Sequence, residues 1–291
     1  MRVMYRKAAD AALVGALLCG TAACTSGSDP APDSKAGQKP FKVTPATAAA
    51  VKRAAEENEK LTSLTYTMSG KVPGGGNVAA KASMSMKPPA IQMKMRGGTA
   101  AETGEVEIRL VDGAMYMNGG KEAAAGMDGK SWLKFDLAAL GKGGGADPMA
   151  GLSSQADRNP AQESASLTAA KDLKEVGEET VDGVRTTHYA GTVTIADMRA
   201  GLKGEDAATK ERREKGLKQY ESMGVDALTL DMWVDENDHT KQFRTRGTSD
   251  KGPLDLTIKF LDLNKPVTVK APPASETMDL AAMMKNASDG T

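Results

Sequence analysis

Apolar and polar residues alternate along the chain between residues 61 and 117, with the period of two that is typical of a β-strand exposed on one face. The alternating runs lie at 64–69, 78–87, 91–96, 105–110 and 115–117. Breaks rich in Gly or Pro, or the pair Asp112-Gly113, separate these runs. The pattern predicts a meander of antiparallel strands joined by short turns.

The same alternation returns in the second half of the chain. It predicts a hairpin of strands at 174–181 and 184–193 around Asp182-Gly183, further strands at 228–235, 241–248 and 254–260, and a short edge piece at 267–269. Helical spacing predicts a helix from Pro45 to about Lys60 with Thr44 as N-cap, a second helix at 195–220, and one or two short helices within 152–173.

The apolar residues of at least eight predicted strands fall on one face, and such a face must be covered. Few helices are predicted, so we expect an α+β fold: a curved antiparallel half-barrel sheet that wraps a few helices, with an apolar concave face. The candidate cavity-lining residues on that face are Tyr66, Met84, Met86, Met93, Met95, Met115, Met117, Leu230 and Met232.

Methionine supplies many of the apolar side chains on that face. The chain has 17 Met against 4 Phe, 5 Tyr and 2 Trp, so flexible thioether side chains take positions that aromatic residues usually fill. Two alternatives remain open on this composition: a soft cavity that accepts acyl chains, or a loosely packed but filled core.

The N-terminus has the pattern of a bacterial lipoprotein signal. Basic residues are followed by the apolar run 11–19 and then by Thr21-Ala22-Ala23-Cys24. We expect cleavage before Cys24 and acylation (palmitate) of its sulfur. The protein would then be lipid-anchored at the extracytoplasmic face of the cell membrane.

The predicted organisation follows from that pattern. Residues 1–23 are the lipoprotein signal peptide and 24–40 a disordered tether, because Ser, Gly, Pro and charged residues cannot bury a core. Residues 41–275 form the lipid-binding half-barrel domain, and 276–291 a short C-terminal helix and tail. The two cysteines, Cys19 and Cys24, both lie in the signal region, which excludes a disulfide framework.

Charge and motifs exclude several function classes. The first 23 residues hold three of the 38 basic and one of the 38 acidic residues, which leaves a net charge of −2 and argues against nucleic-acid binding. Gly129-Lys130-Ser131 lacks the upstream glycine of a phosphate-binding loop. Of the two histidines, His188 lies in a strand and His239 in a polar turn, and neither belongs to a catalytic motif. We expect no enzyme, no cofactor and no metal site.

Several short elements occur in an order that resembles a known family. They are the lipobox, the Met-rich meander, Asp128-Gly129-Lys130-Ser131-Trp132, the hairpin Val181-Asp182-Gly183 to His188-Tyr189-Ala190-Gly191, and Leu230-Asp231-Met232-Trp233-Val234-Asp235. Together they resemble the LppX/LprA/LprF/LprG family of actinobacterial lipoproteins. The resemblance implies a LolA-like half-barrel that carries acylated lipids or glycolipids in an apolar cavity, and it transfers no catalytic residue.

The leading hypothesis is therefore a monomeric, non-enzymatic lipid carrier anchored at the membrane by its N-terminus. The alternative is an extracytoplasmic sensor or protein-interaction module with a filled core.

Overall fold

The computed structural model of the chain describes residues 43–97, 105–137 and 160–283. The chain consists of two units, Met1–Lys39 and Pro40–Thr291, and the first unit lies outside the described residues. The predicted signal peptide, Cys24, the predicted tether and the glycine-rich stretch at 141–145 therefore also lie outside them.

The described residues form a sheet of 12 strands in the order β12-β6-β5-β4-β3-β2-β1-β11-β10-β9-β8-β7. The first six strands along the chain are β1 (Ser63–Val72), β2 (Gly76–Met86), β3 (Pro89–Gly97), β4 (Glu105–Val111), β5 (Ala114–Asn118) and β6 (Trp132–Asp136). The later strands are β7 (Lys174–Val181), β8 (Val184–Thr194), β9 (Ala227–Asp235), β10 (Thr240–Ser249), β11 (Gly252–Leu263) and β12 (Thr277–Asp279). The order is linear, so this is an open half-barrel with few helices, and the predicted α+β class is confirmed.

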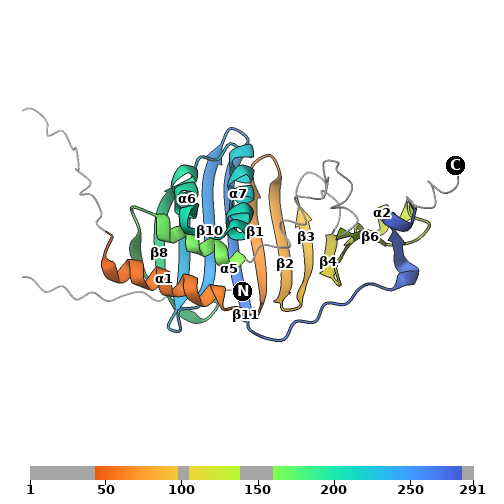
Figure 1. The fold of residues 1–291 in the computed structure, drawn as a ribbon, viewed down its shortest axis with the longest axis horizontal. Helices are drawn as coiled ribbons and strands as arrows, with labels where there is room; N and C mark the ends of the chain where they lie inside the picture. The colour runs from red at the N-terminus through yellow and green to blue at the C-terminus, as the bar shows by residue number, and fades with distance from the viewer. Residues whose placement is uncertain (1–42, 98–104, 138–159, 284–291) are drawn as a thin grey trace, which may run out of the picture. The chain divides into compact units, whose positions relative to one another are not determined.

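Helices cover one part of one face of the sheet (Figure 1). They are α1 (Pro45–Glu59), α5 (Pro160–Glu163), the 3₁₀ helix η1 (Ser164–Ala169), α6 (Ile195–Gly201), the 3₁₀ helix η2 (Leu202–Gly204) and α7 (Ala207–Ser222). They lie over β8–β11 and β1, whereas no described helix lies in front of β2 and β3 (Figure 1). Two small helices lie elsewhere: α2 (Gly120–Ala125) and η3 (Ala274–Glu276).

Tight turns set the register of the hairpins. The pairs Asp112-Gly113 and Asp182-Gly183 have positive φ at both residues, which is the backbone of a two-residue hairpin turn whose twist matches that of the flanking strands. These are the turns that the sequence predicted. Gly70 in β1 has a different role, because a Cβ at that position would lie 1.8 Å from the carbonyl oxygen of Asp255 in β11.

Helix α1 packs against the other helices and the sheet through one stripe of residues. Thr44 caps it by accepting a hydrogen bond from Thr47 N at 3.2 Å, as predicted. Its buried residues recur at helical spacing and include Val51 and Asn58. Asn58 is 1% exposed, and its Nδ2, which carries two hydrogens, lies 2.8–3.1 Å from three acceptors: Ala161 O, Ser164 Oγ and Thr240 Oγ1. One polar side chain therefore joins α1, the α5–η1 segment and β10.

The strand registers place the apolar residues on the concave, helix-bearing face, as predicted. Leu64 pairs with Met84, Met84 with Ile91 and Ile91 with Leu110, so their side chains share a face across four strands. The main core lies between this face and the helices. A smaller cluster of Val111, Ala114, Tyr116 and Trp132 lies on the opposite face, where Val269 packs against it.

The helix predicted at 195–220 is wrong as one continuous element. The chain leaves α6 and η2 at Glu205 and begins α7 after Asp206. The Asp206 side chain accepts a hydrogen bond from Thr209 N at 3.0 Å, so Asp206 is an N-cap that starts a second helix.

Three predictions about the sheet also need correction. Residues 267–269 form no strand but cross the outer face as a strap, where Arg109 Nη1 donates to Lys270 O at 3.0 Å. The predicted C-terminal helix begins as β12, and only residues 280–283 are helical within the described part. Finally, β12 pairs with β6 in parallel, so the sheet is not wholly antiparallel.

Candidate functional site

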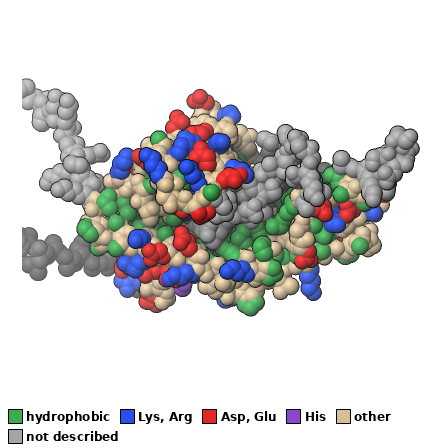
Figure 2. All heavy atoms as spheres, in the orientation of Figure 1, with side chains coloured by type: hydrophobic (Ala, Val, Ile, Leu, Met, Phe, Trp, Pro, Cys, Tyr) green, Lys and Arg blue, Asp and Glu red, His purple; other side chains and the backbone are tan. Residues whose placement is uncertain are grey.

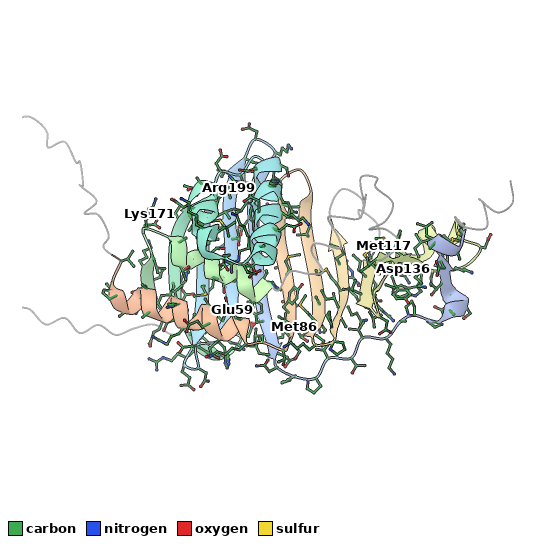
Figure 3. All side chains as sticks on the ribbon, in the orientation of Figure 1. Glu59, Met86, Met117, Asp136, Lys171 and Arg199 are labelled. Carbon is green, nitrogen blue, oxygen red and sulfur yellow. The ribbon has the colours of Figure 1, made fainter. Side chains whose placement is uncertain are left out.

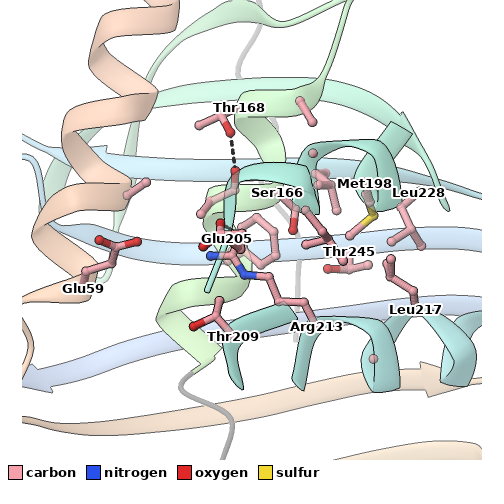
Figure 4. A pocket seen from close by; sticks show the side chains of 18 of the residues that line it. Glu59, Ser166, Thr168, Met198, Glu205, Thr209, Arg213, Leu217, Leu228 and Thr245 are labelled. Carbon is pink, nitrogen blue, oxygen red and sulfur yellow. Dashed lines mark hydrogen bonds and ion pairs between the residues drawn. The ribbon is translucent and has the colours of Figure 1, made fainter. Parts of the chain in front are cut away.

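A cavity of about 730 Å³ opens between the helices and the sheet (Figure 4). Helix α1 and the segment η1 form one wall, α6, η2 and α7 form the other, and β9 and β10 form the floor. The volume lies within the range of about 300–1,000 Å³ that is typical of small-molecule sites. This cavity is therefore the candidate ligand-binding site.

The floor of the cavity is mainly apolar, with Thr245 of β10 as its polar member. Leu228 and Leu230 of β9 and Phe243 of β10 form the floor, and all three are buried. The helices add Met198, Leu202, Leu217 and Tyr220. Of these, Met198 and Tyr220 are half-buried, so their apolar surface gains free energy when hydrocarbon covers it instead of water.

The described part of the cavity rim is polar and mainly acidic. Its charged residues are Lys52, Glu56, Glu59, Glu205, Asp206 and Arg213. Arg213 Nη1 lies 2.6 Å from Glu205 Oε1 and therefore joins α7 to the end of η2. Lys52 and Glu56 form a longer pair of 3.7 Å on the exposed side of α1. An apolar interior with a polar opening suits an amphiphilic ligand.

The predicted cavity residues divide into two groups. Leu230 lines the cavity, and Met232 and Tyr66 are buried in the main core on the same face. Met84 is buried there as well, whereas Met115 is buried farther along the sheet in β5. All five lie on the concave face by strand register.

The other candidates are Met86, Met93, Met95 and Met117, which we call the Met wing. They are half-buried and lie on β2, β3 and β5, away from the helix-covered part of the sheet; Met86 and Met117 are labelled in Figure 3. In Figure 2 apolar side chains gather over β1–β4, beside the charged surface of the helices. The Met wing therefore continues the apolar face of the cavity along the sheet.

Sequence reasoning missed the residues that the helices bring to the cavity, above all Met198 and Leu217. Their positions depend on how α6 and α7 fold over β9 and β10, which no local pattern encodes. Phe243 could have been found, because it occupies an inward position of a predicted alternating strand.

His188 belongs to a polar cluster on the outer face of the sheet. Its Nδ1 lies 2.8 Å from Glu179 Oε1 and its Nε2 lies 3.0 Å from Asp231 Oδ1. Its ring stacks on Trp233 with 4.2 Å between centroids, and Arg246 forms an ion pair with Asp231. We call these five residues the His188 cluster. Both ring nitrogens are engaged by carboxylates, so the cluster holds strands β7–β10 together and offers no free base to a nucleophile.

Hydrogen bonds to the carboxylates of this face lower their pKa values. The indole N–H of Trp233 donates to Glu179 at 2.8 Å and, together with His188, lowers the pKa of Glu179. The Arg244 guanidinium forms two 2.7 Å hydrogen bonds to Asp255 and lowers its pKa as well. Both carboxylates are therefore held charged, and their contacts link neighbouring strands.

The described ranges contain neither a metal-binding cluster nor a membrane-spanning helix. No group of three or more His, Cys, Asp or Glu side chains there is arranged to hold a metal ion. Within the same residues, no helix has both the length and the apolarity to cross a membrane.

Comparison with known proteins gives two sequence relatives, and no family model matches the chain. An uncharacterised 31.2 kDa protein of Streptomyces griseus is 34% identical over 193 residues, which is 66% of this chain and 61% of the relative. A Streptomyces coelicolor protein, provisionally named a lipoprotein, is 31% identical over 198 residues, which is 65% of this chain and 58% of the relative. The chain thus spans about three fifths of the length of these relatives.

Solved structures give the fold. LprF from Mycobacterium bovis superposes with a TM-score of 0.50 at 14% identity, over 79% of this chain and 99% of LprF. The chain has the fold of LprF. The lipoprotein LppX from Mycobacterium tuberculosis is also similar, with a TM-score of 0.47 at 16% identity over 78% of this chain. The resemblance predicted from the sequence is therefore confirmed at the level of the LppX/LprF fold.

Proposed function

We propose that this chain is a membrane-anchored extracytoplasmic lipoprotein that binds and carries an acylated lipid or glycolipid without catalysis. The observation that supports the proposal is the cavity of about 730 Å³ with a floor of Leu228, Leu230 and Phe243. The shared fold with LprF and the provisional lipoprotein name of one relative agree with it. An unfilled cavity also favours a carrier over an interaction module with a filled core.

The energetics of the cavity suit reversible capture. Burying hydrocarbon contributes about 0.8 kcal/mol for each methylene. Ten buried methylenes would then contribute about 8 kcal/mol, which corresponds to a dissociation constant near the micromolar range before the cost of ordering the chain. A ligand held in this range can be delivered as well as captured.

The anchor is proposed from the N-terminal sequence. Cys24 would carry the lipid, and the residues up to Thr44 would link it to α1, which forms a wall of the cavity. Mass spectrometry of membrane fractions tests this step: an acyl-modified N-terminal peptide that disappears with Cys24→Ser supports it. An unmodified chain released from the membrane would refute it.

Lipid capture is tested with two matched substitutions in the Cys24→Ser chain. Met198→Trp places a larger side chain in the cavity wall, and Met117→Trp makes the same change on the Met wing. Both positions are half-buried, so the two variants have similar packing costs. Native mass spectrometry after incubation with lipid extracts measures stoichiometric lipid, and circular dichroism confirms that each variant is folded.

The outcomes are distinct. Loss of lipid with Met198→Trp and retention with Met117→Trp supports the helix-covered cavity as the site. The reverse pattern would move the site to the Met wing, as the sequence predicted. If the unsubstituted chain captures no lipid under gentle conditions, the carrier function is refuted and the filled-core alternative gains support.

A further inference from the structure

The charged rim of the cavity points to the kind of head group that it accepts. Among the described residues, six charged side chains line the opening: the cations Lys52 and Arg213, and the anions Glu56, Glu59, Glu205 and Asp206. The formal charges of these six side chains sum to an excess of two negative charges. A ligand whose hydrocarbon occupies the apolar floor would hold its head group at this rim.

Each positive feature of the rim is already paired with a carboxylate of the chain itself. Arg213 is held at 2.6 Å by Glu205, and Lys52 lies 3.7 Å from Glu56. The N-terminus of α7, a 16-residue helix, would otherwise attract an anion. It is occupied by the Asp206 side chain, which accepts from Thr209 N at 3.0 Å.

One acidic group at the rim has no such counterpart. Glu59 at the end of α1 is exposed, points toward the cavity in Figure 4, and forms no ion pair with any residue in the described part of the chain. Its carboxylate offers only hydrogen-bond acceptors, as do those of Glu56 and Asp206. A phosphate monoester carries about one to two negative charges near neutral pH, so these carboxylates repel it.

Hydroxyl groups have the opposite properties. An uncharged polyol or sugar donates O–H groups to carboxylates and adds no charge of its own. The rim also carries the hydroxyl groups of Ser166, Thr168 and Thr209, which can serve as further hydrogen-bonding groups.

We propose that the cavity selects lipids with an uncharged, hydroxyl-bearing head group and discriminates against phosphate-bearing ones, through the surplus carboxylates of its rim. This inference rests on the proposed lipid-binding function and narrows it to one ligand class.

A pair of ligands that differ by one phosphate tests the inference directly. The probes are 1-palmitoylglycerol and 1-palmitoylglycerol 3-phosphate, each titrated below its critical micelle concentration into the lipid-free full chain with Cys24→Ser. We expect the phosphate to weaken binding by about tenfold or more at low ionic strength, because like charges would be brought together at the rim. The ratio should shrink as salt is added.

A rim variant and a matched control separate local from general charge effects. Glu59→Gln with Asp206→Asn removes two rim charges and preserves the cap of α7, because Asn caps helices as well as Asp does. Glu236→Gln with Asp250→Asn removes the same charge from two exposed turns outside the cavity. We expect the discrimination to fall by about threefold or more in the rim variant and to stay unchanged in the control.

The possible results distinguish a failure of head-group selection from a failure of the carrier function. Equal affinity for the two ligands, or discrimination that is the same in the rim variant and the unsubstituted chain, would overturn head-group selection and leave the carrier function standing. Failure of both ligands to bind would refute the carrier function and this inference with it.

Discussion

Replacing His188 by alanine measures how much the His188 cluster contributes to folding. The substitution removes the hydrogen bond to Glu179 at 2.8 Å, the hydrogen bond to Asp231 at 3.0 Å and the stack on Trp233. Alanine offers no donor to either carboxylate, so Asp231 loses its contact with the imidazole and keeps its ion pair with Arg246. The cluster joins four neighbouring strands, and its loss is expected to lower the free energy of unfolding.

The burial of each partner sets the magnitude. The Glu179 side chain is 47% exposed, so its bond is screened by water and contributes a few tenths of a kcal/mol. The Asp231 side chain is 7% exposed, and a buried hydrogen bond to a charged group contributes about 1.5–3 kcal/mol. Aromatic stacking adds about 1 kcal/mol. We therefore expect His188→Ala to destabilise the protein by about 3 kcal/mol, or roughly 6–12 °C in melting temperature.

The chain supplies its own control, because its other histidine makes a similar but weaker contact. His239 lies in the β9–β10 turn with Nδ1 3.6 Å from Asp235 Oδ2. His239→Ala should cost less than about 0.5 kcal/mol, since the ion pair is long and partly exposed. Urea unfolding of both variants at pH 7, followed by Trp fluorescence, measures the difference. Equal and small losses in the two variants would refute the assignment of His188 as a structural node.

Three further substitutions test other parts of the fold. Asn58→Ala should cost about 2–3 kcal/mol in urea unfolding, because it removes the buried amide that contacts Ala161 O, Ser164 Oγ and Thr240 Oγ1 and joins three elements of the fold. A loss below about 1 kcal/mol would contradict this. Gly70→Ala should disrupt the β1–β11 pairing and lower the melting temperature by more than His188→Ala does, because the added Cβ would overlap the Asp255 carbonyl. An unchanged melting temperature would contradict the close approach of the two strands at this position. Arg244 lowers the pKa of Asp255, so their ion pair stabilises the fold above the unfolded-state pKa of about 3.9, and this contribution is lost as the pH falls through the folded-state pKa. Asp255→Asn should therefore flatten the fall in the free energy of unfolding below about pH 4. An unaltered pH profile of stability would contradict this.

The strands and their turns could be predicted because their signals are local. Alternation of apolar and polar residues defined the faces of the sheet, and Asp182-Gly183 carried the backbone preference of its own turn. The break between α6 and α7 was missed although Asp206 is a good N-cap, because the charged residues on both sides have helical propensity. The parallel β6–β12 pair joins segments more than 140 residues apart, and no local pattern specifies such a contact.

The candidate site was predicted in part for the same reason. Alternation placed Leu230 and the Met wing on one face, and the strand registers confirm that shared face. Which part of the face the helices cover depends on long-range packing, such as the contacts of the buried Asn58 amide. The sequence therefore indicated a Met-lined site, whereas the cavity lies beside it over β9 and β10.

The position of β1 in the sheet bears on how the protein is made. β1 pairs with β2 on one side and with β11, nearly 200 residues later, on the other. During synthesis the middle of the sheet cannot close until residue 263 has left the ribosome, and such high contact order also slows folding. The nascent chain thus remains without its central strand pair until almost all of it has been translated, and an open chain of this kind is the form that can be threaded through a narrow translocation pore.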